Sequence, residues 1–549
     1  MADCEPLLDR DGIARLRAAL ASAGYTASGI ADRLGPAATA AAARNDLRLA
    51  LRATQDRDRL GTLVRLFVCA QTEPADAVAA ALAPLPLAVA LQAGLVEPHR
   101  GGLRPAVDLE PYGEQWWVLS DVPASARPGR PLAADHVLGV GGASTTLADA
   151  TVRAPVGTAL DIGTGCGVQA LHLATHADRV TVTDVSARAL RFAATTAALS
   201  GVGWELLRGD LTAPVAGRRF DLVVSNPPFV AGPGVTTHTY RDSGRAGDAV
   251  CAELAAAAPG LLADGGVCQF LANWLHVAGE DWTERVAGWV AGTGLDAWVI
   301  QREVADPLAY VQLWQADAAE GQELAGEPDG PDPTGRPGWA GGPDPTSGPD
   351  RTAGPDRAGG PNPTSGRGGP GGSGGTGAQR RAEAWLDWFD AHKVEAVGFG
   401  LVTLRAAGRD QPVVRVEELR QQVEPPMGAQ VAAWLARQDW LAGHDRAALL
   451  AQRYRAADGL TLRQEATLGP AGWAVDRQVL ALPTGLRWAE ETDQLVVALV
   501  GGCDGRVPLR DQLALLAAAH DVPEEELAEA ALPLVAHLVE RGFVAAVEA

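Results

Sequence analysis

The chain has 549 residues, too many for one ordinary domain, because domains usually contain about 100 to 200 residues. Asp and Glu outnumber Lys and Arg by 67 to 46, so the formal charge of −21 gives no overall attraction for nucleic acid or for an anionic membrane. The six cysteines are scattered, without a CxxC pair or metal-ligand spacing. This pattern argues against a disulfide framework and a metal site, and it favours reduced thiols in the cytoplasm.

Residues 1–128 are expected to form a mostly helical, winged-helix-like module. Apolar residues recur at helical spacing up to about residue 95, and short strand-like pieces follow. The N-terminus lacks the basic and apolar regions of a signal peptide. The longest apolar stretch, 77–96, contains Pro84 and Pro86, so we expect two short helices and no membrane span. A local basic face is expected from six arginines, although aspartates between them reduce its positive charge. These arginines are Arg44, Arg48, Arg52, Arg57, Arg59 and Arg65.

Short apolar runs alternate with helical segments between about residues 133 and 305. The runs are TALDI, RVTVTD, WELLRGD, FDLVVS, VCQFLANW and LDAWVIQ, and most are continuous in Val, Leu and Ile. Such runs are typical of strands buried on both faces, and their alternation with helices predicts a parallel sheet of the α/β class.

A low-complexity tract occupies residues 326–377. It is mostly Gly and Pro, contains no Leu, Ile, Val or Phe, and repeats GPDPTS-like units every six residues, so it is predicted to be disordered. We therefore define a central unit at 129–406 with an insertion at 318–379. Residues 407–549 are expected to form a second winged-helix-like module.

A glycine-rich loop and two acids stand at the ends of successive predicted strands. The loop DIGTGCG opens a helix, Asp184 ends the next strand about twenty residues later, and Asp210 ends a third strand. Glycines let the backbone approach a ligand, and a carboxylate can accept both hydroxyls of a ribose. A tight turn or a strand-end cap would explain each feature alone, but together they indicate a nucleoside ligand. Asp161 stands two residues before the first glycine, where it suits the ammonium of an amino-acid tail better than a pyrophosphate.

The segment SNPPF follows the run FDLVV, and its prolines must stop that strand at the end where ligands bind. In order and spacing, DIGTGCG, TDVSARAL, RGDL and SNPPF resemble the class I S-adenosylmethionine-dependent methyltransferases. They are most similar to the branch with an (N/D)PP(Y/F) motif, which includes HemK-like release-factor glutamine methyltransferases and small-domain RNA methyltransferases. The resemblance covers roughly 130–305 and implies a Rossmann-like, seven-stranded sheet whose last, antiparallel strand is EAVGFGLVTL, beyond the tract.

The resemblance also implies the roles of individual residues. S-adenosylmethionine would contact Asp161, Gly163, Thr164, Gly165, Cys166, Gly167, Asp184, Val185, Asp210, Leu211 and Asn226. The catalytic corner would comprise Asn226, Pro227, Pro228 and Phe229. Asn226 and the Pro227 carbonyl would accept hydrogen bonds from a planar NH2, and Phe229 would stack on it. HVLGVGGASTTLA would cover the cofactor, and YRDSGRAGD resembles a substrate segment of the glutamine enzymes.

Two kinds of acceptor remain open from the sequence. NPPFV, RDSGRAGD and the acidic chain favour a protein glutamine, with a translation factor as the partner. Phe229 departs from the usual tyrosine of the glutamine and adenine enzymes and is nearer to the guanine ones. An amino group of RNA (guanine) or DNA (adenine) is therefore the alternative, with the flanking modules binding nucleic acid. The leaving sulfonium needs no metal.

Overall fold

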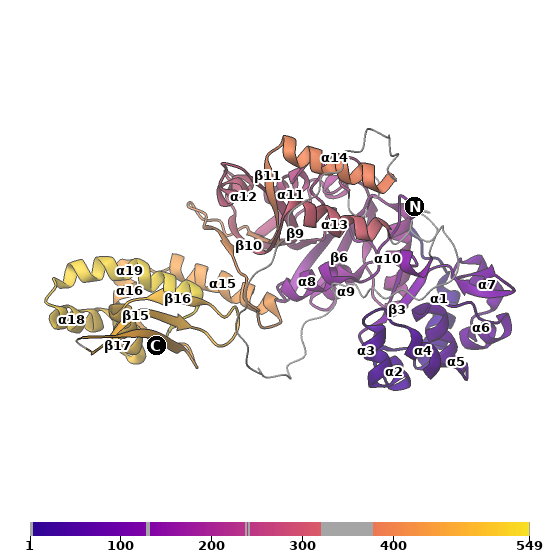
Figure 1. The fold of residues 1–549 in the computed structure, drawn as a ribbon, viewed down its shortest axis with the longest axis horizontal. Helices are drawn as coiled ribbons and strands as arrows, with labels where there is room; N and C mark the ends of the chain where they lie inside the picture. The colour runs from indigo at the N-terminus through magenta and orange to yellow at the C-terminus, as the bar shows by residue number, and fades with distance from the viewer. Residues whose placement is uncertain are drawn as a thin grey trace, which may run out of the picture.

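The computed structural model describes residues 4–127, 132–236, 239, 242–319, 377–470 and 472–547. Three parts follow one another along the long axis of the molecule, with the N-terminal module at one end, a large sheet in the middle and the C-terminal module at the other end (Figure 1). The expected Gly/Pro-rich tract lies almost entirely outside the described residues.

The N-terminal module consists of short helices followed by two β-hairpins. Its helices are α1 (Arg10–Ala23), α2 (Ala27–Leu34), α3 (Pro36–Ala42), α4 (Arg48–Ala53), α5 (Arg59–Leu63), α6 (Ala75–Leu82) and α7 (Leu87–Gln92). Its hairpins are β1 (Val96–His99) with β2 (Gly102–Pro105), and β3 (Asp108–Tyr112) with β4 (Trp116–Ser120). The apolar stretch at 77–96 thus forms two short helices, as predicted. Within the described residues, no helix is long and apolar enough to cross a bilayer.

The central sheet has eight strands in the order β12-β10-β11-β9-β8-β5-β6-β7. They are β5 (Val156–Ile162), β6 (Ala177–Asp184), β7 (Glu205–Arg208), β8 (Phe220–Ser225), β9 (Leu262–Val277), β10 (Asp296–Ala305), β11 (Val394–Arg405) and β12 (Val414–Glu418). β11 is antiparallel to both β9 and β10, which confirms the position expected for EAVGFGLVTL. The eighth strand was not expected. β12 pairs in parallel with β10, so it covers what would otherwise be an open sheet edge.

Helices cover both faces of this sheet (Figure 1). They are α8 (Gly142–Ala150), α9 (Val168–Leu173), α10 (Ala187–Ser200), α11 (Ala249–Leu261), α12 (Trp282–Val290), α13 (Pro307–Ala319) and α14 (Gly377–Ala391). The segment DPLAYVQLWQAD is helical, as its spacing predicted, and α13 and α14 pack against each other although the tract separates them in sequence. The Rossmann-like α/β fold expected from the sequence is therefore confirmed.

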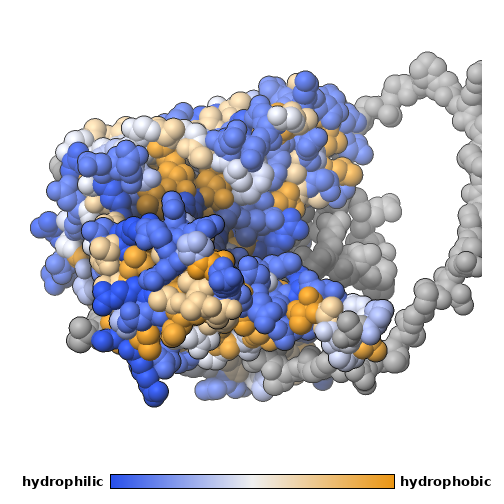
Figure 2. Space-filling model, turned by 90° about the vertical axis from the view of Figure 1, so that its left-hand side faces the viewer, coloured by the Kyte–Doolittle hydropathy of each residue, from blue (hydrophilic) through white to orange (hydrophobic). Residues whose placement is uncertain are grey.

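The C-terminal module packs on one face of the sheet. Its helices are α15 (Met427–Ala442), α16 (Arg446–Ala451), α17 (Gln494–Gly501), α18 (Leu509–His520) and α19 (Glu524–Arg541). Its strands are β13 (Arg453–Ala456), β14 (Thr461–Gly469), β15 (Gly472–Ala481), β16 (Ala489–Thr492), β17 (Asp504–Pro508) and β18 (Val544–Ala546). Trp298 of β10 stacks on Trp434 of α15 with ring centroids 4.5 Å apart, inside one continuous core. The outer end of the module is mostly hydrophilic, with hydrophobic residues in smaller areas (Figure 2). Mostly helical flanks are present at both ends; their likeness to winged helices stays a prediction.

Candidate functional site

A hollow opens at the carboxyl ends of the central strands β5, β6, β7 and β8, where open α/β sheets bind ligands. We call it the carboxyl-end hollow. Four strand ends contribute to its wall, and the segment 136–144, here called the lid segment, closes it from one side. The sequence-predicted residues in its lining are Gly163, Thr164, Gly165, Cys166, Asp184, Val185, Asp210, Leu211, Asn226 and Pro228. The sheet thus brings the four motifs together at one edge.

The glycine loop after β5 has a backbone that only glycine adopts easily. Gly163, Gly165 and Gly167 have φ values of +72°, +55° and +88°, all in the left-handed region. The amides of Gly163 and Thr164 donate to the carbonyl oxygen of Thr183 at 2.9 and 3.0 Å, which ties the loop to β6. Cys166 is buried, and burial raises the pKa of its thiol to about 12, so it packs as a neutral side chain.

Asp161 is a buried acid beneath this loop, with only 1% of its surface exposed. Its Oδ2 accepts a hydrogen bond from the Thr164 hydroxyl at 2.6 Å. Its Oδ1 is buried and has no hydrogen-bond partner in the described part of the chain. Burial raises the pKa of Asp161 to about 7, and the Thr164 hydrogen bond opposes the shift. A buried carboxylate with an unused oxygen is suited to a cationic group of a ligand.

Asp184 joins the glycine loop to the start of α10. Its Oδ2 accepts from the Gly165 amide at 2.9 Å and its Oδ1 accepts from the Ser186 amide at 2.8 Å. Each oxygen keeps a further lone pair for a ligand hydroxyl. Burial raises the pKa of Asp184, while these backbone hydrogen bonds lower it. The next side chain, Val185, is half exposed in the hollow and offers an apolar surface for a flat ring.

Asp210 lies at the rim of the hollow, and an arginine that does not line the hollow holds its carboxylate. Its Oδ2 accepts from Nη2 of Arg245 at 3.0 Å, and the same guanidinium binds Glu253. Leu211, the next residue, has a φ of +44°, a strained conformation for a residue with a side chain. Arg245 belongs to the segment YRDSGRAGD, whose proximity to the site the sequence predicted.

The NPPF corner, Asn226 to Phe229, follows the end of β8, and two of its residues, Asn226 and Pro228, line the hollow, whereas Pro227 and Phe229 do not. Asn226 borders the hollow, and its Oδ1 is buried with no hydrogen-bond partner among the residues that the structure describes. The Pro227 carbonyl accepts from the Phe229 amide at 2.7 Å, which leaves it one lone pair. Phe229 also forms an isolated antiparallel bridge with Asp242, the first residue of the described range 242–319.

Aromatic residues from α13 and α14 support this corner, and no sequence motif identified them. The Tyr310 hydroxyl accepts from the Ala231 amide and from Nδ2 of Asn273, both at 2.8 Å. Trp314 meets Phe229 edge to face with ring centroids 6.3 Å apart. Across the tract, Trp385 of α14 packs on Tyr310 at 6.4 Å. Only the fold brings these helices to the corner.

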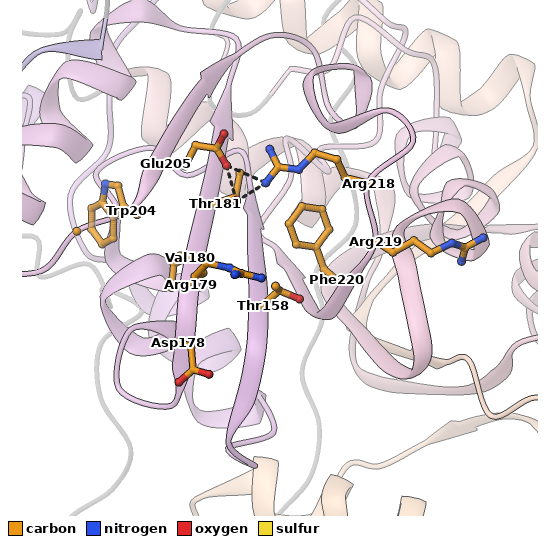
Figure 3. A pocket seen from close by; sticks show the side chains of 11 residues that line it. Thr158, Asp178, Arg179, Val180, Thr181, Trp204, Glu205, Arg218, Arg219 and Phe220 are labelled. Carbon is orange, nitrogen blue, oxygen red and sulfur yellow. Dashed lines mark hydrogen bonds and ion pairs between the residues drawn. The ribbon is translucent and has the colours of Figure 1, made fainter.

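A second hollow, the amino-end groove, lies at the amino ends of the same strands, opposite the carboxyl-end hollow. Figure 3 shows the side chains that line it. It contains arginines, but Arg218 pairs with Glu205 at 2.7 Å and Arg219 donates to the carbonyl oxygens of Pro259 and Leu262. None of the predicted motifs reaches this groove. The carboxyl-end hollow is therefore the candidate site. Among the described residues, no group of three or more His, Cys, Asp or Glu is arranged to hold a metal ion.

Three family models match the chain. Residues 139–277 match a methyltransferase small domain, which includes the glycine loop, both acids and the NPPF corner. Residues 22–106 and 432–546 match two families described only as domains of unknown function. The matched methyltransferase segment thus coincides with the strands and loops that build the candidate site.

Curated relatives match a part of the chain. The chain is 37% identical over 117 residues to ribosomal RNA small subunit methyltransferase C of Alcanivorax borkumensis, covering 21% of this chain and 32% of that protein. It is 34% identical over 128 residues to the Citrobacter koseri protein of the same name, covering 23% and 36%. The chain thus spans about a third of the length of these relatives. A solved methyltransferase of Pyrococcus furiosus is 20% identical, with a TM-score of 0.22, and covers 28% of this chain and 72% of that one.

Proposed function

Residues 139–277 form a class I S-adenosylmethionine-dependent methyltransferase domain of the small-domain group, and from this premise we propose that the protein methylates an exocyclic amino group of an RNA base. Guanine is our first candidate. The observation that carries the proposal is the oxygen of Asn226, which is buried without a hydrogen-bond partner in the described residues, at the edge of the hollow. The motif ends in Phe229, the variant that is nearest to the guanine enzymes.

The donor side of the hollow fits S-adenosylmethionine in charge and in hydrogen bonding. We assign the free oxygen of Asp161 to the ammonium of its amino-acid tail and the carboxylate of Asp184 to the ribose hydroxyls. Asp210 would accept from the adenine amino group, and its ion pair with Arg245 would fix its orientation. When bound, S-adenosylmethionine supplies a methyl group on a positively charged sulfur.

The acceptor side orients a nitrogen and needs no metal. Asn226 Oδ1 and the Pro227 carbonyl oxygen would each accept a hydrogen bond from one N–H of the target amino group. The nitrogen lone pair would then point at the methyl carbon. S-adenosylmethionine would supply the methyl group, with the electron pair of the broken C–S bond staying on its sulfur, and the nitrogen held by these two oxygens would gain the N–C bond and release one proton to solvent. Positioning by the two oxygens and stacking on Phe229 would provide the rate enhancement.

A protein glutamine is the second candidate acceptor. The bridge between Phe229 and Asp242 favours it, because it brings to the corner the segment that resembles the substrate segment of glutamine enzymes. The N-terminal module also carries less free positive charge than its sequence suggests: Arg57 and Arg65 pair with Glu73, and Arg48 pairs with Asp46. We rank RNA first because the curated relatives named above are ribosomal RNA methyltransferases.

The experiment is transfer of labelled methyl from S-adenosylmethionine into extract of cells that lack the protein. The extract is then fractionated into RNA, DNA and protein, and RNA nucleosides are separated by mass. We expect label in RNA, as a methylated guanine, and a loss of at least about a hundredfold in rate for Asn226→Ala, the scale for removing one positioned catalytic group. S-adenosylhomocysteine should still bind this variant, because the donor contacts remain.

Label in protein alone, recovered as methylglutamine, would replace the RNA proposal with the second candidate. Label that is equally strong with Asn226→Ala would remove the NPPF corner from the catalytic site. We also propose a cytoplasmic location, where the six free cysteines stay reduced.

A further inference from the structure

The lid segment over the carboxyl-end hollow is held from behind by the N-terminal module. The contact is made at the end of β4, where Asp121 follows the last strand residue, Ser120. Asp121 does not line the hollow itself, but two of its neighbours in space do. Its side chain is only 11% exposed.

Asp121 is bonded to the lid segment through both its backbone and its side chain. Its amide donates to the carbonyl oxygen of Val137 at 2.9 Å, and its Oδ2 accepts from the Val137 amide at 2.9 Å. This two-way pairing fixes the backbone between His136 and Leu138, which both face the hollow. His136 lies close as well, with Nδ1 3.7 Å from Oδ2 of Asp121.

The same carboxylate binds the first turn of α10. Arg188 donates to Asp121 from Nε at 2.9 and 3.1 Å and also from Nη2. This interaction raises the pKa of Arg188, and its guanidinium also lies 4.8 Å from the centre of the Phe192 ring. Arg188 is next to Ala189 and two residues after Ser186, both of which line the hollow. One carboxylate therefore sets the spacing between the lid segment and the loop that carries Asp184.

Other contacts join the N-terminal module to the same wall. Glu110 of β3 accepts from the Val140 amide at 3.3 Å, and the Tyr112 hydroxyl lies 2.8 Å from Nε2 of His172 in α9. One hydrophobic core runs from the module into the helices behind the hollow, through Leu109, Val118, Val137, Cys166, Val168, Ala189 and Phe192. The N-terminal module is thus packed against the donor loops as part of one body.

We propose that the N-terminal module, including the part matched only by a domain of unknown function, is a structural component of the S-adenosylmethionine site, and that Asp121 is its positioning residue. The inference rests on the donor assigned under the proposed function and is independent of the acceptor. Loss of the carboxylate releases the lid segment from α10, so the hollow is no longer preorganised for the donor.

The test is Asp121→Asn, which keeps the size of the side chain and removes its charge. Titration calorimetry with S-adenosylhomocysteine should show a dissociation constant raised by about tenfold, on the scale of one charge-assisted hydrogen bond. In turnover assays with saturating acceptor, the KM for S-adenosylmethionine should rise, and kcat at saturating donor should stay unchanged. Arg188→Gln should reproduce the effect, because it breaks the same pair.

The matched control is Glu540→Gln in the C-terminal module. Glu540 is 7% exposed and accepts a two-pronged hydrogen bond from Arg415, whose exposure of 49% is close to the 41% of Arg188. Both variants should lower the unfolding temperature, but only Asp121→Asn should weaken ligand binding. Unchanged binding in Asp121→Asn, or equal weakening in both variants, would overturn the proposal. Because the calorimetry uses no methyl acceptor, it tests the role of Asp121 even if the proposal of an RNA acceptor fails.

Discussion

The loops on the donor side of the hollow are held mainly by one another, whereas the NPPF corner is held by residues far away in the sequence. On the donor side, Gly163 binds Thr183, Gly165 binds Asp184, and the Gly209 amide donates to the Asp184 carbonyl at 3.0 Å. On the acceptor side, Tyr310 binds Ala231, 79 residues away.

This difference explains why sequence motifs identify the donor loops but not the residues that hold the NPPF corner. Donor loops are fixed by short turns between neighbouring parallel strands, so glycines and strand-end acids carry most of the information. The acceptor corner needs α13 and α14, which enclose the tract. Gly232 shows how close the approach is: a Cβ there would come within 3.1 Å of the Trp385 ring. The specificity of the corner therefore depends on helices that no motif identifies.

The largest effect is expected on the donor side, from Asp184→Ala. The change removes the acceptor that we propose for the ribose hydroxyls and the hydrogen bond from the Gly165 amide, and each hydrogen bond to a charged group contributes about 1.5 to 3 kcal/mol. We expect the affinity for S-adenosylhomocysteine to fall by about a hundredfold in calorimetry. Asp178→Ala, at the exposed amino end of the same strand, is the control and should bind normally. Near-normal affinity of Asp184→Ala would remove this carboxylate from the site.

A smaller effect, confined to the acceptor side, is expected from Tyr310→Phe. The variant leaves the Ala231 amide and the Asn273 side chain without their buried acceptor, so the NPPF corner loses its fixed position. The rate of methyl transfer should fall by about tenfold, while the affinity for S-adenosylhomocysteine stays unchanged. The free energy of unfolding should fall by about 1 to 3 kcal/mol.

The control for this variant is Tyr454→Phe, which removes another buried tyrosine hydroxyl that donates to the Leu449 carbonyl. It should lose stability without losing activity. If Tyr310→Phe weakened donor binding as much as transfer, the two sides of the site would not be independent.

The smallest effect concerns pH. Burial raises the pKa of Asp161 from 3.8 to about 7, and only the carboxylate attracts the donor's ammonium. Affinity for S-adenosylhomocysteine should therefore fall about threefold between pH 7.5 and 6.5, as expected for one proton bound with this pKa. Asp161→Asn should bind more weakly and lack this step. An identical pH profile in the variant would contradict the assignment.

The stability of the free protein should depend on Asp161 in the opposite direction. Because the folded pKa lies above the unfolded value, the folded state binds the proton more tightly. This contribution to the free energy of unfolding is complete below about pH 4 and is lost as the pH rises to about 7. Asp161→Asn should therefore flatten the dependence of thermal stability on pH in that range.

The sequence predicted the strand-to-helix alternation and the position of the seventh strand, and the structure confirms both. It did not predict β12, because 414–418 follows the catalytic segment and was assigned to the next module. It left the role of the N-terminal module open, with nucleic-acid binding as one alternative. Neither Asp121 nor Tyr310 stands in a motif, so their contacts with Val137 and Ala231 were invisible before the fold was known.

By itself, the sequence indicated the glycine loop and the strand-end acids that we propose for the methyl donor, because glycines with positive φ and acids at strand ends act where neighbouring parallel strands end. Only the tertiary structure decided what holds the lid segment and the NPPF corner. Those supports include hydrogen bonds between segments that lie apart in the sequence, by 16 residues for Asp121 with Val137 and by 79 residues for Tyr310 with Ala231. Side chains that act at such separations carry no local pattern, since their function depends on where the packed helices place them.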